Sequence, residues 1–141
     1  MNIRPATADD APACAAIVTD WIEATDWMLD GPSRDDLEAM MRVGFPAREA
    51  WVAEIDGEVA GYLSMRPDEA HIVGLYVASP GNGTGKALID HVKKDRDRLQ
   101  LRSHSPNRAA HRFYAREGFE IIERDLDGTD GLPEFLLEWR R

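Results

Sequence analysis

The segment from Asn107 to Phe119, Asn-Arg-Ala-Ala-His-Arg-Phe-Tyr-Ala-Arg-Glu-Gly-Phe, constrains the fold more than any other part of this sequence. Asn107, Ala110 and Tyr114 recur at the spacing that places side chains on one face of an α-helix. Asn107 is a favoured N-cap residue, and Gly118 suits the left-handed conformation that ends a helix. The segment therefore predicts a short helix with an amide, a small residue and a phenol on a single face.

A glycine-rich loop leads into a second predicted helix, which carries Leu88, Ile89 and Val92. The loop follows an apolar segment at 71–77 that predicts a strand. Strand, glycines and helix form the layout of an anion-binding helix N-terminus, where backbone N–H groups and the helix dipole favour negative charge. A nucleotide-binding P-loop is excluded, because Pro80 and Ala87 replace its first Gly and its final hydroxyl residue.

The rest of the chain is predicted to alternate helices and strands. Asp56-Gly57 between two apolar runs is a strong signal for a β-hairpin. Ser33 is expected to cap a helix that contains Leu37, and an earlier helix is expected over the stripe that ends at Ile22. We expect strands at 3–5, 51–55, 59–65, 71–77, 99–102, 119–123 and 134–139, a turn at Pro67-Asp68, and a last helix at 107–117.

Composition limits the function classes. The chain has 141 residues, 43% of them hydrophobic, which predicts a single domain over 1–141 with a real core. Its net charge of -9 disfavours nucleic acid and favours cationic amines. Cys14 is the only cysteine, which excludes an intrachain disulfide, and it is expected in the core. Without a long apolar stretch or a secretory signal, we expect a cytoplasmic protein with no membrane partner.

The pattern Asn-x-x-Ala-x-x-Phe-Tyr-x-x-x-Gly-Phe, together with the order of predicted elements, resembles the GCN5-related N-acetyltransferases across nearly the whole chain. Its fixed positions are Asn107, Ala110, Phe113, Tyr114, Gly118 and Phe119. The resemblance implies an α/β fold with a mixed, largely antiparallel twisted sheet and helices on both faces. It also implies acetyl transfer from acetyl-coenzyme A to a primary amine by direct attack in a ternary complex, without a metal.

The resemblance further implies a coenzyme site. The loop residues Gly81, Asn82, Gly83, Thr84 and Gly85 would hold the pyrophosphate, helped by Lys86. Pro80 departs from the Arg or Gln of the family, and this departure keeps open a catalytically silent sensor that binds coenzyme A.

The same resemblance implies roles for four more residues. Tyr76 and Val77 would face the acetyl oxygen, and Asn107 the pantetheine arm. Tyr114 would protonate the leaving thiolate, which a phenol of pKa about 10 can do. Gly74 inside the preceding strand is typical either of a β-bulge or of close packing.

The site of the acceptor amine is less defined by the sequence than the coenzyme site. Trp27 and His71 are the expected acceptor contacts, and the general base is sought among His71, Glu69, Glu54 and His104, or a water chain. The acceptor could be a small amine, an amino acid, an antibiotic or a protein N-terminus. A homodimer and a small interaction module without chemistry are the other open alternatives.

Overall fold

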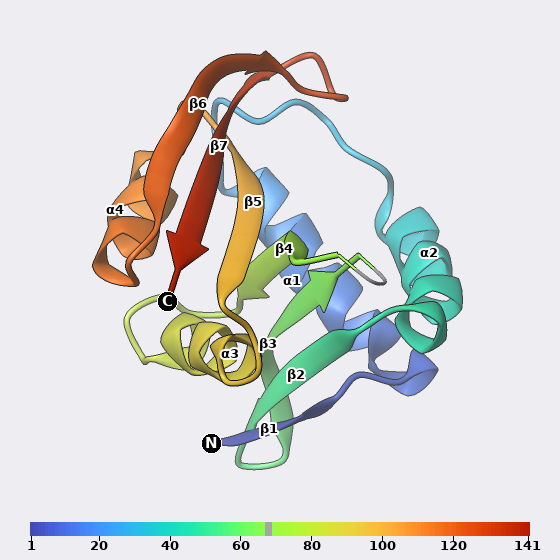
Figure 1. Cartoon of the computed structure of the whole chain (residues 1–141). Helices are drawn as coiled ribbons and strands as arrows, with labels where there is room; N and C mark the ends of the chain where they lie inside the picture. Colours follow the sequence, from blue (N-terminus) through green and yellow to red (C-terminus); the bar gives the residue numbers. More distant parts are fainter. Residues whose placement is uncertain (67–68) are drawn as a thin grey trace.

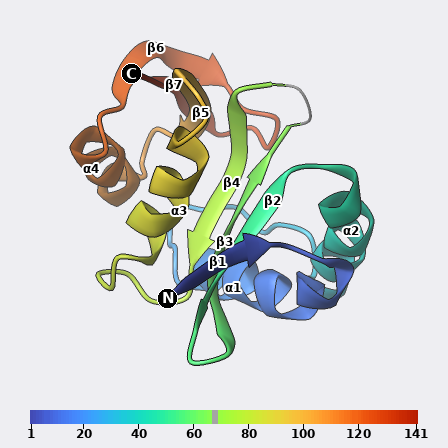
Figure 2. The same cartoon turned by 60° about the horizontal axis from the view of Figure 1, so that its bottom comes forward.

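The computed structural model describes residues 1–66 and 69–141 and contains one seven-stranded sheet with helices on both faces (Figures 1 and 2). The strands are β1 Asn2–Pro5, β2 Ala50–Ile55, β3 Glu58–Met65, β4 His71–Val77, β5 Arg98–His104, β6 Glu120–Asp127 and β7 Pro133–Arg140. The helices are the 3-10 turn η1 Ala8–Asp10 and α1 Ala11–Glu23, α2 Arg34–Ala47, α3 Thr84–Lys93 and α4 Arg108–Arg116. The predicted turn at Pro67-Asp68 lies outside the described residues.

The sheet order is β1-β2-β3-β4-β5-β7-β6, and only the β4–β5 pair is parallel. The predicted mixed, largely antiparallel sheet is therefore confirmed. Only two residue pairs join β4 to β5, His71 with Gln100 and Ile72 with Leu101. Beyond Ile72 the two strands are no longer paired, so the sheet opens toward their carboxyl ends.

A β-bulge accompanies this opening. In the β3–β4 ladder Ser64 pairs with Gly74 but Met65 pairs with Ile72, which leaves Val73 as an extra residue in β4. The bulge reading of Gly74 is thus confirmed. Because an extra residue bends the strand that carries it, the bulge helps to turn β4 away from β5.

Helices cover both faces of the sheet (Figure 2), and each face has its own apolar core. Side chains of α3 and α4, such as Leu88 and Tyr114, pack on one face, and those of α1 and α2 pack on the other. Cys14 is buried in the α1–α2 core as predicted, and burial raises the pKa of its thiol to about 12. It therefore serves packing rather than chemistry.

The predicted chain reversals are also found. Asp56 and Gly57 both have positive φ, as a type I′ hairpin turn requires. Gly118 has φ of 92° directly after α4, and the Asn107 side chain accepts a hydrogen bond from the Ala110 N–H at the start of that helix. Among the residues described, no helix has both the length and the apolarity needed to cross a bilayer.

Candidate active site

Aromatic side chains from four segments meet at the opening between β4 and β5. Trp21 of α1 packs edge-on against Trp27, in the connection to α2, with ring centres 5.7 Å apart. Trp21 also contacts Tyr76 of β4, with ring centres 5.5 Å apart. Trp27 packs against His104, at the end of β5, at 5.4 Å. The structure thus brings the predicted acceptor contact Trp27 beside one of the candidate bases.

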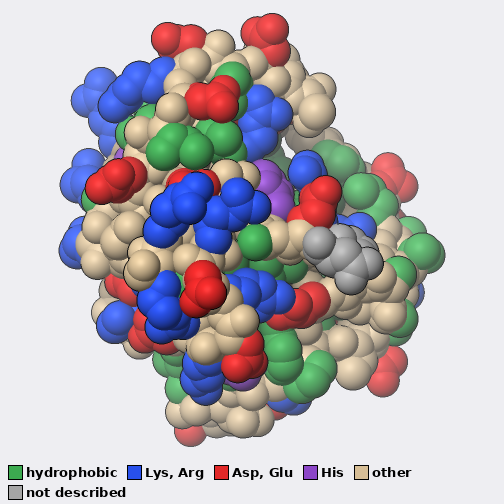
Figure 3. All heavy atoms as spheres, viewed as in Figure 1, with side chains coloured by type: hydrophobic (Ala, Val, Ile, Leu, Met, Phe, Trp, Pro, Cys, Tyr) green, Lys and Arg blue, Asp and Glu red, His purple; other side chains and the backbone are tan. Residues whose placement is uncertain are grey.

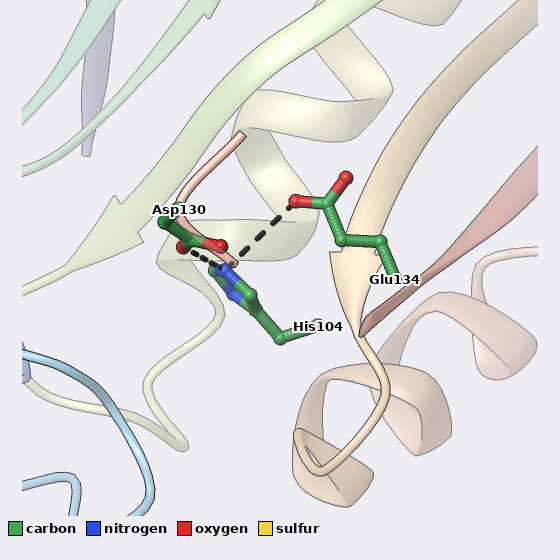
Figure 4. A group of neighbouring side chains, drawn as sticks. All are labelled: His104, Asp130 and Glu134. Atoms are coloured by element: carbon green, nitrogen blue, oxygen red, sulfur yellow. Dashed lines mark hydrogen bonds and ion pairs between the residues drawn. The ribbon is translucent and has the colours of Figure 1, made fainter. Parts of the chain in front are cut away.

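His104 is held by two carboxylates that follow it in the chain, those of Asp130 and Glu134 (Figure 4). Its Nε2 lies 2.7 Å from Asp130 Oδ2, in the β6–β7 loop, and 3.9 Å from Glu134 Oε2. Glu134 also pairs with Arg102, at 3.1 Å. An Nε2–H that donates to Asp130 leaves Nδ1 as the ring nitrogen that can accept a proton.

Asp130 is suited to accept the hydrogen bond from His104, because its carboxyl group favours the ionised form. Burial opposes its ionisation, but hydrogen bonds from the Leu132 N–H and from His104 hold its pKa below the ordinary value. The ligand atoms of His104, Asp130 and Glu134 lie within 4.8 Å of one another, a grouping that could also hold a cation. Because His104 already bonds Asp130 and Arg102 already neutralises Glu134, the contacts favour a positioned imidazole over a metal centre.

Tyr114 lies in α4, on the face of the sheet opposite to α1 and α2. Its ring is buried edge-on between Phe113 and Phe119, at centre distances of 5.1 and 5.4 Å. Burial raises the pKa of this phenol, and the proximity of Tyr76 adds to the effect. Tyr114 is therefore a phenol that keeps its proton at neutral pH.

Tyr76 lies in β4, beyond the last residue pair with β5. Its own pKa is raised by burial and, second, by the charge of Asp130. Its ring contacts Trp21 of α1 and Tyr62 of β3. The predicted position of Tyr76 at the opening thus agrees with the structure, and Val77 follows it at the end of β4.

The glycine loop has the geometry of an anion cradle. Gly81 and Gly83 have φ of 87° and 81°, and the space where their Cβ atoms would be is open. At the start of α3, the N–H groups of Gly85 and Lys86 have no acceptor among the described residues. Asn82 Oδ1 accepts hydrogen bonds from the N–H and hydroxyl of Thr84, which fixes the turn. Free N–H groups at a helix start fit a pyrophosphate.

Lys86 has a different surrounding from the one expected. Its Nζ lies 3.2 Å from Asp90 and 3.2 Å from Glu117, so carboxylates of the protein already neutralise this first-turn cation. A bound anion is therefore not required to neutralise Lys86, and the contact of Lys86 with the coenzyme stays a prediction. Gly85 permits α3 to approach α4, because a Cβ there would lie 3.2 Å from the Phe113 ring.

Other candidate residues lie away from the opening. His71 is at the start of β4, where the strands are still paired, and it lines a separate hollow of about 360 Å³ with Arg66, Glu69 and Gln100. Burial lowers its pKa. Glu54 is paired with Arg4 at the edge of the sheet. The structure does not bring His71, Glu69 or Glu54 to the aromatic cluster.

Two site residues were not singled out from sequence. Trp21 belongs to the predicted helix over the stripe that ends at Ile22, and Asp130 lies between the last two predicted strands. Nothing local in the sequence links Asp130 to His104, which precedes it by 26 positions. His111 stacks on Phe135, and its Nε2 is buried without a partner in the described structure, so it points inward rather than to solvent.

Comparisons with known proteins identify the family and agree with the fold. Residues 46–121 match the family described as "Acetyltransferase (GNAT) domain". The peptidyl-lysine N-acetyltransferase YiaC of Escherichia coli is 28% identical, over 97% of this chain and 95% of its own. The solution structure of apo YjaB from Escherichia coli superposes with a TM-score of 0.78, at 24% identity, over 98% of this chain and 96% of that one. The YncA acetyltransferase from Salmonella typhimurium, solved with its cofactor acetyl-coenzyme A, has a TM-score of 0.72, at 20% identity, over 99% and 92% of the two chains.

Proposed function

The chain belongs to the GNAT family of acetyltransferases, and on that premise we propose that it acetylates lysine side chains of proteins. It is an N-acetyltransferase, and acetyl-coenzyme A is its acyl donor. The choice of lysine rests on the likeness to YiaC along nearly the full length of both chains. The observation that carries the proposal is the opening between β4 and β5, with the His104–Asp130 pair at the end of β5 and Tyr114 in α4.

The residues of the loop and of α4 fit the coenzyme. N–H groups at Gly85 and Lys86 would hold its pyrophosphate, and the missing side chains of Gly81 and Gly83 leave room for it. The Asn107 Oδ1 atom caps α4, so its Nδ2 is free to bind the pantetheine arm. When bound, acetyl-coenzyme A supplies an activated thioester carbonyl.

His104 is the proposed general base. A lysine ammonium must lose a proton before its nitrogen can attack, and Nδ1 of His104 accepts that proton while Asp130 holds Nε2–H. Trp21 and Trp27 provide apolar walls suited to the methylene groups of lysine. The net charge of -9 attracts the cationic side chain toward the protein.

Tyr114 is the proposed general acid. Tyr114 is buried and its pKa is raised, so its hydroxyl keeps a proton that it can donate to the thiolate that leaves. The base comes from β5 and the acid from α4. This arrangement suits direct transfer with both substrates bound together, which avoids a covalent enzyme intermediate.

The decisive experiment compares wild type with His104→Gln and Asp130→Asn on lysine-containing peptides, with acetylation measured by mass spectrometry. Removing a general base costs about 10²–10⁴-fold, so we expect a drop in kcat/KM of this size at pH 7 for His104→Gln. The Asp130→Asn loss should be smaller, because the imidazole remains. The defect should narrow as pH rises toward 10, where lysine deprotonates unaided.

Wild-type protein at high concentration that acetylates small amines but no lysine peptide would show that the acceptor is wrong. A His104→Gln defect of constant size across this pH range would show that His104 is not the base.

A further inference from the structure

A second hollow, distinct from the aromatic cluster, lies between α2 and the bulged part of β4. Its volume is about 220 Å³, and its walls are mostly apolar. Leu37, Met40 and Phe45 of α2 line one side, and Val73 lines the other. Met40 and Val73 are among the large apolar side chains that remain exposed. Apolar side chains are visible at the surface over α2 in Figure 3.

The sheet register creates this hollow. Tyr62 and Ser64 project from β3 toward α2, because alternate residues of a strand face the same side. Ser64 pairs with Gly74, so two positions opposite each other carry almost no side chain. Tyr76, which pairs with Tyr62, forms the wall between this hollow and the aromatic cluster.

One polar atom that lines the hollow is buried without a hydrogen-bond partner among the described residues. The Ser64 Oγ is buried without a hydrogen-bond partner, and the residue as a whole is only 5% exposed. The Tyr62 hydroxyl approaches Gly74, where it would lie 3.9 Å from an added Cβ. A buried hydroxyl without a partner is destabilising, and natural proteins keep such groups mainly for a ligand or a water.

A cationic side chain, that of Arg48, lies beside the hydroxyl groups of Tyr62 and Ser64 in the lining of the hollow. Arg48, just after α2, lines the hollow and makes no ion pair with any residue in 1–66 or 69–141. Its guanidinium lies across Gly44, where a Cβ would approach to 3.2 Å. Arg48 and the two hydroxyls can all donate hydrogen bonds, whereas a carboxylate accepts only.

We propose that this hollow recognises an acidic side chain next to the acceptor lysine, through Arg48, Tyr62 and Ser64. The methylene groups of that side chain lie against Leu37 and Met40, and its carboxylate meets the guanidinium. This inference rests on the proposed lysine acetylation and adds to it a preference for Glu beside the lysine. The negative net charge of the protein disfavours an acidic side chain, so the preference for Glu depends on the local contacts with Arg48, Tyr62 and Ser64.

The test is a set of lysine peptides that carry Glu or Gln at each flanking position in turn, compared by kcat/KM. Hydrogen bonds to charged groups give about 1.5–3 kcal/mol, so we expect at least about a tenfold preference for Glu at one position. In the Arg48→Gln variant, the ratio of kcat/KM for the Glu peptide to kcat/KM for the Gln peptide should be close to one. Gly44→Ala should reduce it, because the methyl group displaces the guanidinium, whereas the helix itself gains from Ala.

Arg34→Gln is the matched control, since it removes the same charge from the start of the same helix and should keep the ratio. Ser64→Ala should lower the ratio while leaving the protein at least as stable.

Equal rates for Glu and Gln peptides at every position would overturn the proposal while lysine acetylation stood. A preference for the Glu peptide that persists in the Arg48→Gln variant would also overturn it. The same holds for a higher kcat/KM with a Leu peptide than with the Glu peptide. Failure of all lysine peptides would instead overturn the proposed function.

Discussion

The hydroxyl of Tyr114 is the smallest group on which the proposed chemistry depends. The ring already packs between Phe113 and Phe119, so Tyr114→Phe removes one oxygen and keeps the packing. We expect unchanged coenzyme affinity and nearly unchanged stability, with acetyl transfer slower by about 10²–10⁴-fold. Single-turnover transfer at saturating coenzyme measures this directly, because product release cannot hide the chemical step. Equal rates for the two proteins would make Tyr114 a packing residue.

His104 acquires its role from a neighbour distant in sequence. As a histidine at a strand end it was one of four candidate bases, and residue type alone could not rank them. The hydrogen bond to Asp130 and the contact with Trp27 separate it from His71, whose ring lies at the paired end of β4. Such ranking needs the arrangement of the β6–β7 loop against β5, which no local pattern encodes.

The loop before α3 is an element whose charge environment can be tested. Gly83 has φ of 81° with open space on its Cβ side, so a side chain there meets strain but no clash. We expect Gly83→Asp to weaken acetyl-coenzyme A binding far more than Gly83→Asn, because a carboxylate would repel the pyrophosphate. Asn and Asp tolerate the left-handed conformation similarly, so Asn controls for strain. Calorimetric titration gives both affinities, and equal losses would refute the electrostatic argument.

The junction of β1 with the start of α1 depends on an ion pair. Asp10 accepts two hydrogen bonds from the Arg4 guanidinium, at 2.8 and 2.9 Å, and one from the Thr7 N–H. The bonds from Arg4 lower the pKa of Asp10 below 3.8, although burial opposes the shift. A lowered folded-state pKa stabilises the fold above the unfolded value, and this stabilisation is lost as pH falls through the folded-state pKa.

We therefore expect Asp10→Asn to lower the free energy of unfolding by about 1–3 kcal/mol at pH 7. The difference from wild type should be constant above about pH 5 and shrink below about pH 4. Urea unfolding at several pH values measures it. A difference independent of pH down to pH 3 would mean that the Asp10 charge adds nothing to stability.

The elements themselves were largely predictable. Asp56-Gly57 and the stripe from Asn107 to Tyr114 are local signals, and local signals fix hairpins and helix ends. The ends of β6 and β7 were predicted too short, because their flanking residues are polar and exposed. The hollow under α2 was not foreseen, because it arises from the pairing of Ser64 in β3 with Gly74 in the neighbouring strand β4, a register that no local pattern reveals.

At the scale of the whole molecule, the sheet is weakest where the chemistry is proposed. Two residue pairs alone join the β1–β4 part to the β5–β7–β6 part, whereas β5 and β7 are paired along their full length. The two parts are otherwise tied by α3 and α4, which meet through Gly85 and Phe113 and through the Lys86–Glu117 ion pair. A ligand between β4 and β5 that also contacts both helices would therefore join the parts.

We accordingly expect acetyl-coenzyme A to stabilise the protein as a unit. At a concentration about 100 times its dissociation constant, a ligand that binds only the folded state adds about 2.7 kcal/mol. The unfolding midpoint should rise, and hydrogen exchange should slow in β4 beyond Ile72 and in β5 together, because the proposed coenzyme site lies against both strands. Gly83→Asp provides the control, since it should lose both effects at the same ligand concentration. Protection confined to the loop before α3, with β5 unchanged, would mean that the coenzyme binds one part of the sheet only.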